Sequence, residues 1–547
     1  MSQGSDLHNE SQRRLGVVVE GSLTRGVEVR LDGGVSIEDI AVGRYVTIEG
    51  ERRRFFGMIT DAELGTIDPR LLTMPPDISD PFIAEVLAGT GTYGRIHVLP
   101  VLTIGGDAMG LLEGPQPVKT VPAHFSAVRE ASERDVEQVF GGVEERQFYI
   151  GTPLDMETKV RLDPGELVVR SSGVFGKSGT GKTFLARLLL IGIIQEGAAV
   201  NLVFDMHSEY GWEGSSEEGR KVKALKQLFP SKVAVFALDE EGARRRNVST
   251  DFVVKIGYDE VEPEDIAMLQ ETLGLSEAAV QATYRLARHY GERRWLECFL
   301  DVEGREDIAA LAQGLGEHEA TLAALRRRLD VLRRLSFLVP HAADNAIRHI
   351  LEYLDRGMNV VLEFGRFTDI VAYILVANLL TRRIHERWRE RTERAIGGDG
   401  DKPPPLVITI EEAHKFLSRE LAGHTIFGTI AREMRKYNCT LLVIDQRPSG
   451  IDEEVMSQIG TKITCLLDNE RDIESVLTGV SGKGELRAVL AKLDSRQQAL
   501  IFGHAVPMPV VVRTREYGSA QSYSELGIRD ALERRRQAEE EGRDLWG

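Results

Sequence analysis

The stretch GKSGTGKT at residues 176–183 constrains the fold of this chain more than any other feature of the sequence. It fits the pattern G-x-x-x-x-G-K-[ST], in which a glycine-rich loop joins a β-strand to an α-helix and cradles phosphate groups. Residues 165–175 before it predict the strand, and residues 182–197 after it carry apolar side chains at helical spacing. An ordinary glycine-rich turn is the alternative, but a strand before and a helix after favour a phosphate loop.

The residue types of this loop each have a chemical reason. Glycines at 176, 179 and 181 let the backbone turn its N–H groups toward phosphate oxygens. Lys182 can reach the β- and γ-phosphates, and Thr183 can offer its hydroxyl to Mg²⁺. We therefore expect a nucleoside triphosphate to contact one continuous set of residues: Gly176, Lys177, Ser178, Gly179, Thr180, Gly181, Lys182, Thr183 and Phe184.

Length and composition set the outer limits. A chain of 547 residues is too long for one ordinary core, so two or three domains are expected. No apolar run approaches the roughly 20 residues that span a bilayer, which predicts no membrane segment. The polar N-terminus carries no signal-peptide pattern, and the three cysteines are far apart. We expect a reduced, cytoplasmic protein.

The order of predicted elements divides the chain into regions. Short strand-like runs dominate the first hundred residues and predict a small β-barrel or sandwich. From about residue 146, strands alternate with helices, which predicts a mostly parallel sheet with helices on both faces. The expected organisation is a β-domain at 1–110, a connector at 111–145, two parts of an α/β core at 146–258 and 356–515, a helical insertion at 259–355 and a helical tail at 516–547.

The predicted insertion carries a cluster of basic residues: Arg326, Arg327, Arg328, Arg333 and Arg334. A solvated helix face paired with nearby acids explains such a run more often than contact with DNA. Both interpretations stay open at this point.

Two carboxylates end a buried-type strand. Glu411 and Glu412 follow the apolar run at 406–410, and the carboxyl ends of parallel strands face the ligand crevice. Glu411 is expected to hold the Mg²⁺ shell, and Glu412 to polarise the attacking water as a general base. An ordinary surface turn is the weaker alternative.

A second buried-type strand, at 439–445, is followed by Gln446, an amide that can touch both the γ-phosphate and the catalytic water. Just upstream, Arg432 and Arg435 lie near the C-terminal end of a predicted helix. Basic residues favour that end for helix-dipole reasons alone. The functional alternative is an arginine finger offered to the nucleotide of a neighbouring subunit.

These motifs, in this order and spacing, resemble those of the HerA family, in the HerA/FtsK branch of ring ATPases. The residues that carry the resemblance are GVFGKSGTGKT at 173–183, NLVFDMHSEYG at 201–211, VITIEEAHKF at 407–416, AREMRKYN at 431–438 and VIDQRPSGIDEEVMSQIGTKI at 443–463. The N-terminal region resembles the small β-barrel of that family, and residues 500–514 resemble its closing strand pair. The resemblance implies a RecA-like P-loop core.

The chain departs from the family pattern in two places. Glu411 stands where many such ATPases have Asp, although its longer side chain can still reach a hydrated Mg²⁺. Residues 205–210 read DMHSEY where the more usual sequence is D-P-H-G-E-Y. Asp205 and Glu209 keep their places, so the resemblance still implies that both lie near the nucleotide.

The resemblance implies a homohexameric motor that uses ATP with Mg²⁺, or Mn²⁺ in its place, to translocate along duplex DNA in its pore. It also implies a NurA-type nuclease docked on the barrel for DNA end resection in recombinational repair. The net charge of −17 does not exclude DNA, because only a narrow pore lining would touch it. Two alternatives remain: a ring ATPase of an antiviral defence complex, and a structural ring with little turnover.

Overall fold

The computed structural model describes residues 12–105 except 74, 75 and 78, then 114–140, 147–215, 221–419, 422, 426–480, 482–494, 497–519, 521–523 and 526. The chain forms two compact units. The first comprises residues 1–163, 175–181 and 460–515, and the second comprises residues 164–174, 182–459 and 516–547. Each unit is described by itself below.

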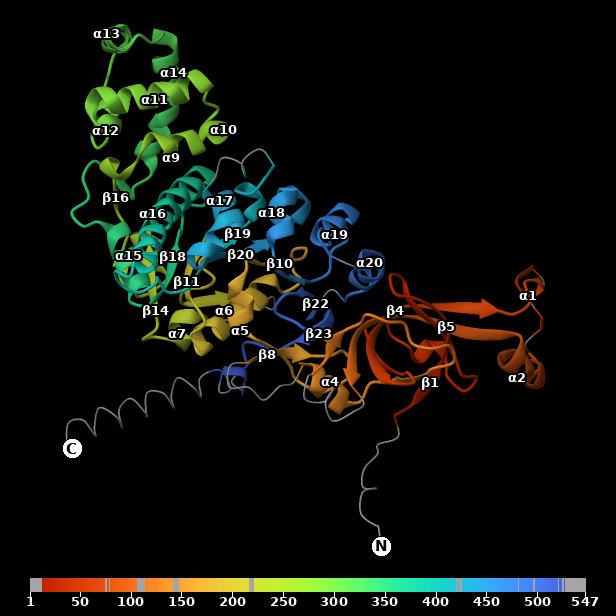
Figure 1. The fold of residues 1–547 in the computed structure, drawn as a ribbon. Helices are drawn as coiled ribbons and strands as arrows, with labels where there is room; N and C mark the ends of the chain where they lie inside the picture. The colour runs from red at the N-terminus through yellow and green to blue at the C-terminus, as the bar shows by residue number, and fades with distance from the viewer. Residues whose placement is uncertain are drawn as a thin grey trace, which may run out of the picture. The chain divides into compact units, whose positions relative to one another are not determined.

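The first unit contains a closed β-barrel (Figure 1). Six strands follow one another in the order β2-β1-β7-β3-β4-β5, and a β2–β5 pairing closes the ring. Alternating side chains such as Val27, Val29, Val46 and Ile48 fill its core. The bounds are β1 (Arg14–Ser22), β2 (Gly26–Leu31), η1 (Ile37–Asp39), β3 (Tyr45–Glu49), β4 (Arg53–Thr66), β5 (Thr92–Gly105), β6 (Gln116–Pro117) and β7 (Ala127–Glu130).

Strands β4 and β5 run on beyond the barrel as a long hairpin (Figure 1). They carry α1 (Arg70–Thr73) and α2 (Pro81–Thr90) at its end. The segment expected to be a connector supplies β7, which pairs with β1 and β3. Residues 111–113 and 141–146 of that segment lie outside the described residues.

The rest of the first unit is antiparallel. Strands pair in the order β21-β22-β23-β8-β9, each antiparallel to the next. The bounds are α4 (Glu133–Phe140), β8 (Phe148–Thr152), β9 (Val160–Leu162), β21 (Thr461–Thr464), α19 (Glu470–Val476), α20 (Lys483–Ala491), β22 (Gln498–Gly503) and β23 (Val510–Thr514). The hairpin β22–β23 corresponds to the strand pair expected at 500–514.

The second unit is built on a sheet whose strands follow the order β15-β14-β18-β11-β19-β20-β10. The pairings from β15 to β20 are parallel, and helices lie on both faces (Figure 1). The strand bounds are β10 (Ser172–Phe175), β11 (Val200–Asp205), β14 (Val233–Ala237), β15 (Phe252–Val253), β18 (Asn359–Glu363), β19 (Leu406–Glu411) and β20 (Cys439–Asp445).

The helices and short strands around this sheet follow the predicted alternation. Their bounds are α5 (Pro164–Val169), α6 (Lys182–Glu196), β12 (Glu213–Ser215), β13 (Lys221–Lys223), α7 (Leu225–Leu228), α8 (Glu240–Arg245), α16 (Ile370–Ile396), η4 (Ala413–Lys415), α17 (Ile426–Glu433), η5 (Met434–Tyr437), η6 (Pro448–Gly450) and α18 (Glu453–Gln458). The strand before the phosphate loop is shorter than its apolar run predicted, because residues 164–169 form α5 and only 172–175 form β10.

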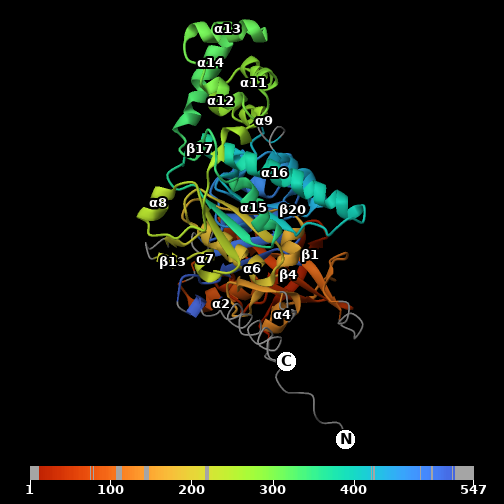
Figure 2. The same cartoon turned by 90° about the vertical axis from the view of Figure 1, so that its left-hand side faces the viewer.

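A helical region follows β15 and precedes β18 in the chain, and Figure 2 shows its helices α9 and α11 to α14. Its core includes Leu286, Trp295, Phe299 and Leu325, which are all fully buried. The bounds are β16 (Ile256–Gly257), η2 (Tyr258–Glu260), α9 (Pro263–Met268), α10 (Gln270–Leu273), α11 (Glu277–Tyr290), α12 (Trp295–Leu300), α13 (Arg305–Leu315), α14 (Glu319–Leu329), η3 (Asp330–Arg334), β17 (Leu338–Val339) and α15 (Ala346–Asp355).

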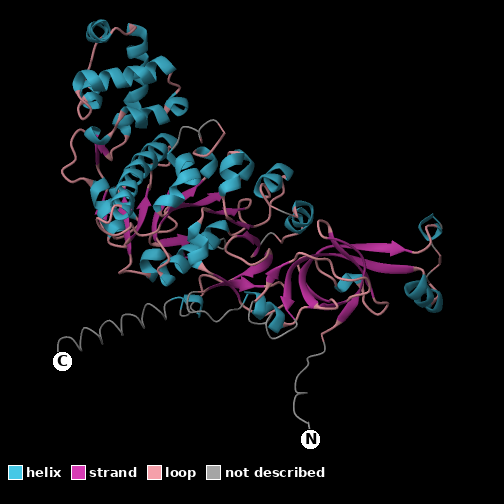
Figure 3. Cartoon of the chain, viewed as in Figure 1, coloured by secondary structure: helices cyan, strands magenta, loops and turns pink. Residues whose placement is uncertain are grey.

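The structure confirms the predicted fold class, an α/β core with a helical insertion and a small N-terminal β-barrel (Figure 3). Most of the predicted C-terminal helical tail at 516–547 lies outside the described residues. No helix in the described ranges is long and apolar enough to cross a bilayer.

Candidate functional site

The phosphate loop has the backbone that its glycines predict. Gly176, Gly179 and Gly181 have φ values of 154°, 79° and 89°, which side-chain-bearing residues rarely adopt. A Cβ on Gly176 would lie 2.8 Å from the Cβ of Cys465, so this position has no room for a side chain. The N–H of Lys177 donates to the carbonyl of Leu466 at 3.1 Å. Ser178 is exposed, and the hydroxyl of Thr180 donates to the carbonyl of Lys177 at 2.8 Å.

The loop leads directly into α6, which begins at Lys182 and places Thr183 and Phe184 in its first turn. The N–H groups of a first helical turn have no partner inside the helix and attract anions. The ring of Phe184 lies 5.9 Å from that of Tyr517. Arg187, one turn further on, is fully buried, and its guanidinium lies 5.2 Å from the Phe184 ring and 5.8 Å from the Tyr210 ring.

The ends of β11 and β19 hold a buried acidic pair that Tyr210 connects. The carboxylate of Asp205 accepts the N–H groups of Glu209 and Tyr210, each at 2.8 Å. The hydroxyl of Tyr210 donates to Oε1 of Glu411 at 2.9 Å. Asp205, Tyr210 and Glu411 are all buried. The DMHSEY segment therefore turns back on its own strand end and supports Glu411.

Burial dominates the electrostatics of this pair. Desolvation raises the pKa of Glu411 to about 8, and the neighbouring charge of Asp205 adds to the shift. Oε2 of Glu411 is buried and has no hydrogen-bond partner within the described parts of the chain. Burial likewise raises the pKa of Asp205. The unpaired oxygen of this buried carboxyl group can therefore take either a proton or a cation.

Glu363, at the end of β18, is a third acid that the sequence analysis missed. It lies opposite Asp205 in the parallel register and pairs with Arg246 at 2.7 Å. Desolvation, followed by the charge of Asp205, raises the pKa of Glu363. The run NVVLEF at 359–364 predicted the strand, but only the strand order shows that its terminal acid is next to Asp205.

Glu412 and Gln446 meet beyond the ends of the adjacent parallel strands β19 and β20. Nε2 of Gln446 donates to Oε1 of Glu412 at 2.7 Å. Glu412 has φ 51° and ψ 45°, a left-handed conformation that is uncommon outside glycine. Backbone strain of this kind is concentrated at functional sites.

His414 and Asp445 complete this group, and the sequence analysis assigned neither of them a role. Nδ1 of His414 lies 3.0 Å from Oδ2 of the buried Asp445 and 3.7 Å from Oε2 of Glu412. Asp445 ends β20 directly before Gln446, as Glu411 ends β19 directly before Glu412. An acid followed by a polar residue at both strand ends was the available signal, but it could not show that the two ends touch.

The two candidate arginines differ. Arg432 is half-buried, pairs with Glu454 at 3.1 Å and donates to the carbonyl of Ala422 at 2.7 Å. Arg435 is exposed in η5, and no carboxylate in the described ranges lies within ion-pair distance of it. Neither residue contacts the acids described above. Only Arg435 keeps its guanidinium available.

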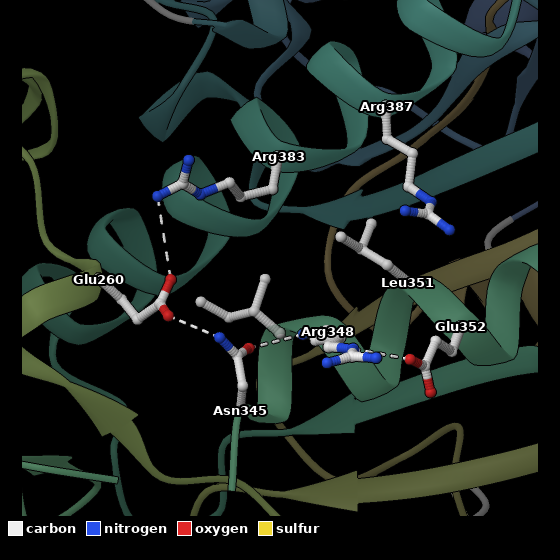
Figure 4. Close-up of a pocket in the computed structure, with 8 residues that line it drawn as sticks. Glu260, Asn345, Arg348, Leu351, Glu352, Arg383 and Arg387 are labelled. Carbon is white, nitrogen blue, oxygen red and sulfur yellow. Dashed lines mark hydrogen bonds and ion pairs between the residues drawn. The ribbon is translucent and has the colours of Figure 1, made fainter.

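A separate cavity of about 270 Å³ lies between α15, α16 and η2 (Figure 4). None of its lining residues belongs to the predicted site. Each of its three arginines already pairs with a carboxylate: Arg348 with Glu352, Arg383 with Glu262 and Arg387 with Asp355. The cavity therefore offers no unpaired cation to a phosphate.

Comparisons with known proteins identify the family. A family model described as "Helicase HerA, central domain" matches residues 148–384, and one described as "HAS barrel domain" matches residues 15–108. Over its central region the chain is similar to the HerA helicase family. This confirms the resemblance that the sequence motifs showed, and makes the protein a P-loop ATPase of the HerA type.

Relatives match over most of the chain. A DNA double-strand break repair helicase HerA from Pyrococcus furiosus is 26% identical over 436 residues, which cover 74% of this chain and 76% of that protein. A protein of the same name from Sulfolobus acidocaldarius is 25% identical over 516 residues, covering 93% and 96%. Among solved structures, VirB4 of Thermoanaerobacter pseudethanolicus has 13% identity and a TM-score of 0.44, covering 70% of this chain and 99% of that chain.

Proposed function

We propose that this HerA-family protein hydrolyses ATP to translocate along duplex DNA, as a cytoplasmic homohexameric ring in recombinational repair. The observation that carries the proposal is the contact between Glu412 and Gln446, 2.7 Å apart at adjacent strand ends, one residue beyond the buried Glu411. A chain that bound ATP only for assembly would not need a positioned base beside an amide sensor.

Mg²⁺ fits the residues present. Oε2 of Glu411 is a buried carboxylate oxygen without a partner in the described chain, and Mg²⁺ prefers oxygen ligands. The described residues include no cluster of three or more His, Cys, Asp or Glu side chains suited to a metal. A site completed by substrate phosphates agrees with this, because Mg²⁺ usually takes only one or two protein ligands. Thr183 and Glu411 would hold the ion, which would neutralise phosphate charge.

The remaining roles follow from chemistry and place. Lys182 and the N–H groups of the loop 176–181 would bind the phosphates. Glu412 would take a proton from the attacking water, and Gln446 would hold that water against the γ-phosphate. Asp205 and Glu209 would lie near the nucleotide at the end of β11. Phe184 would contact the nucleotide from the first turn of α6.

Arg435 is the better candidate for a finger that acts on a neighbouring subunit. The guanidinium of Arg432 already pairs with Glu454 and with the carbonyl of Ala422. An arginine finger must instead reach charge that develops on another subunit's phosphate. A site completed by a neighbour requires head-to-tail contacts, which close into a ring.

We also propose that a NurA-type nuclease docks on the barrel unit. The hairpin end carries exposed apolar side chains, among them Leu64, Leu72 and Phe82, and such clusters mark protein interaction sites. Phe82→Asp should abolish co-purification of the nuclease. Ile396→Asp is the matched control, because Ile396 is 76% exposed, as Phe82 is 72% exposed, but lies in α16. Equal retention by both variants would contradict the barrel assignment.

ATP turnover with and without linear duplex DNA tests the proposal as a whole. Wild-type protein should hydrolyse ATP faster with DNA, and Lys182→Ala should bind no nucleotide. Arg435→Ala should bind ATP and lose about 10³- to 10⁵-fold in turnover, the range of arginine fingers. Mixed with Glu412→Gln subunits, it should regain partial activity. Turnover that DNA does not change would contradict the translocase, and little turnover with or without DNA would leave a structural ring as the better description.

A further inference from the structure

One imidazole lies between the strand end that carries the proposed base and the strand end that carries the proposed sensor. Nδ1 of His414 is 3.0 Å and 3.1 Å from the two carboxylate oxygens of Asp445. The backbone N–H of His414 also donates to Oδ2 of Asp445, at 2.7 Å. Since a carboxylate only accepts, Nδ1 carries the proton. His414, three residues beyond the end of β19, is thus bonded to the end of β20 by both its backbone and its side chain.

The same nitrogen faces the proposed base. Nδ1 of His414 lies 3.7 Å from Oε2 of Glu412, and Oε1 of Glu412 accepts from Gln446. Asp445 is fully buried, and its Oδ1 also accepts the N–H of Arg447 at 2.6 Å. The side chain of His414 is 26% exposed. A buried carboxylate therefore fixes a partly solvated imidazole beside the carboxylate of Glu412.

Glu412 needs such support. Its left-handed backbone places it outside both β19 and the short η4 turn that follows. Strained conformations persist only where the surroundings fix them. Gln446 and His414 supply the two side-chain contacts described for Glu412, and Gln446 must turn toward phosphate if it acts as a sensor. His414 is then the contact that stays.

We propose that His414, fastened by Asp445, is a positioning residue that holds the Glu412 carboxylate toward the attacking water and couples it to the strand end of Gln446. The inference rests on the proposed function, in which Glu412 is the base. It adds a link, from Glu412 through His414 to Asp445, that joins the ends of the two strands.

The charges around His414 should make its support of Glu412, and with it ATP turnover, depend on pH. The hydrogen bond to Asp445 raises the pKa of His414 above its ordinary value, the charges of Asp445 and Glu412 add to this, and partial burial and Lys415 oppose it. A raised pKa means that the cation is present below the folded-state pKa and is lost as the pH rises through it. Turnover should therefore fall on the alkaline side when the imidazolium beside Glu412 is lost.

ATP turnover of the full-length protein at saturating ATP, measured across pH, tests the proposal. His414→Gln keeps a neutral donor for Asp445 but removes the cation. We expect turnover to fall about ten- to a hundredfold, as is typical for groups that orient a functional ligand. Binding of a non-hydrolysable ATP analogue should stay unchanged, and the alkaline fall should disappear. Lys415→Gln removes a positive charge from the same turn and should keep both turnover and the alkaline fall.

The outcomes separate the inference from the proposed function. Wild-type protein without ATP turnover would overturn the proposed function itself. If wild-type protein turns over ATP and Glu412→Gln abolishes that turnover, the proposed function stands. The inference alone is overturned if the turnover of His414→Gln is within twofold of wild type, or still falls at high pH. If His414→Gln does not fold, the wild-type profile decides, because the proposal requires its alkaline fall.

Discussion

Two neighbouring carboxylates of this protein lie in opposite surroundings. Glu411 ends β19 inside the protein, near the charge of Asp205, and accepts from the hydroxyl of Tyr210, with one oxygen unpaired in the described chain. Glu412, one residue later, is 21% exposed and faces a polar amide and an imidazole. One peptide unit therefore separates a carboxyl group buried from solvent from a partly solvated one. Backbone geometry makes the difference, since a left-handed residue at 412 turns the chain out of the strand.

Different surroundings suit the two acids to different tasks. A desolvated carboxylate gains most from a cation, because burial disfavours its unpaired charged form. A carboxylate near water, held by donors, can exchange protons with a substrate molecule. Two acids with contrasting environments are the usual sign of divided roles at an active site. The comparison supports the proposal that Glu411 holds the metal and Glu412 takes the proton.

The largest expected effect comes from replacing each of the two acids, Glu411 and Glu412, in turn. Glu412→Gln should lower ATP turnover by about 10² to 10⁴, the typical contribution of a positioned base, and should leave ATP and Mg²⁺ binding unchanged. Glu411→Gln should weaken Mg²⁺ binding, so that raising the Mg²⁺ concentration restores part of its activity. Titrations of turnover against Mg²⁺ measure both.

The control for this pair lies in the same titration. Turnover of Glu412→Gln should level off, at its low value, at the same Mg²⁺ concentration as turnover of the wild type, because its metal site is intact. If Glu412→Gln were instead rescued by Mg²⁺ and Glu411→Gln were not, the roles of the two residues would be exchanged.

The sequence predicted the local parts of this site well. The phosphate loop, the strand before Glu411 and the strand before Gln446 all follow from apolar runs and glycine spacing. That Glu412 and Gln446 lie at the same edge of the sheet also followed, because parallel strands end at one edge, but their contact did not. These features depend on residues close together in the chain or on one rule of sheet topology.

What could not be predicted depends on contacts between distant segments. His414 meets Asp445 only because β19 and β20 are adjacent in this order, with Glu411 opposite Ile444. Nothing in the sequence DMHSEY shows that Tyr210 contacts Glu411, which lies 201 positions later in the chain. The helix at 164–169 was missed because a short apolar run cannot distinguish helix from strand by periodicity alone.

The pH dependence of Mg²⁺ activation gives the next effect in size. The pKa of Glu411 is raised to about 8, so below that pH the metal-free carboxyl is protonated and Mg²⁺ must displace a proton. The Mg²⁺ concentration for half-maximal turnover should therefore rise about tenfold for each pH unit below 8 and level off above it. Glu411→Gln should remove this slope. A wild-type requirement that is flat between pH 6 and 9 would show that Glu411 is not the metal ligand.

The smallest expected effect tests whether Tyr210 tunes Glu411. Burial raises the pKa of Tyr210 well above its ordinary value, so the phenol keeps its proton and donates it to Oε1 of Glu411. That hydrogen bond favours the charged carboxylate and lowers its pKa. Tyr210→Phe should therefore raise the pKa of Glu411 further and increase the Mg²⁺ requirement at pH 7 by about tenfold, the lower end of what one hydrogen bond to a charged group contributes. Tyr373→Phe is the matched control, because the buried Tyr373 hydroxyl donates to the backbone carbonyl of Glu411, at 3.3 Å, and not to the carboxylate. An equal shift in both variants would reduce the role of Tyr210 to packing, whereas a shift in Tyr210→Phe alone would show that the DMHSEY segment sets the metal affinity of the neighbouring strand.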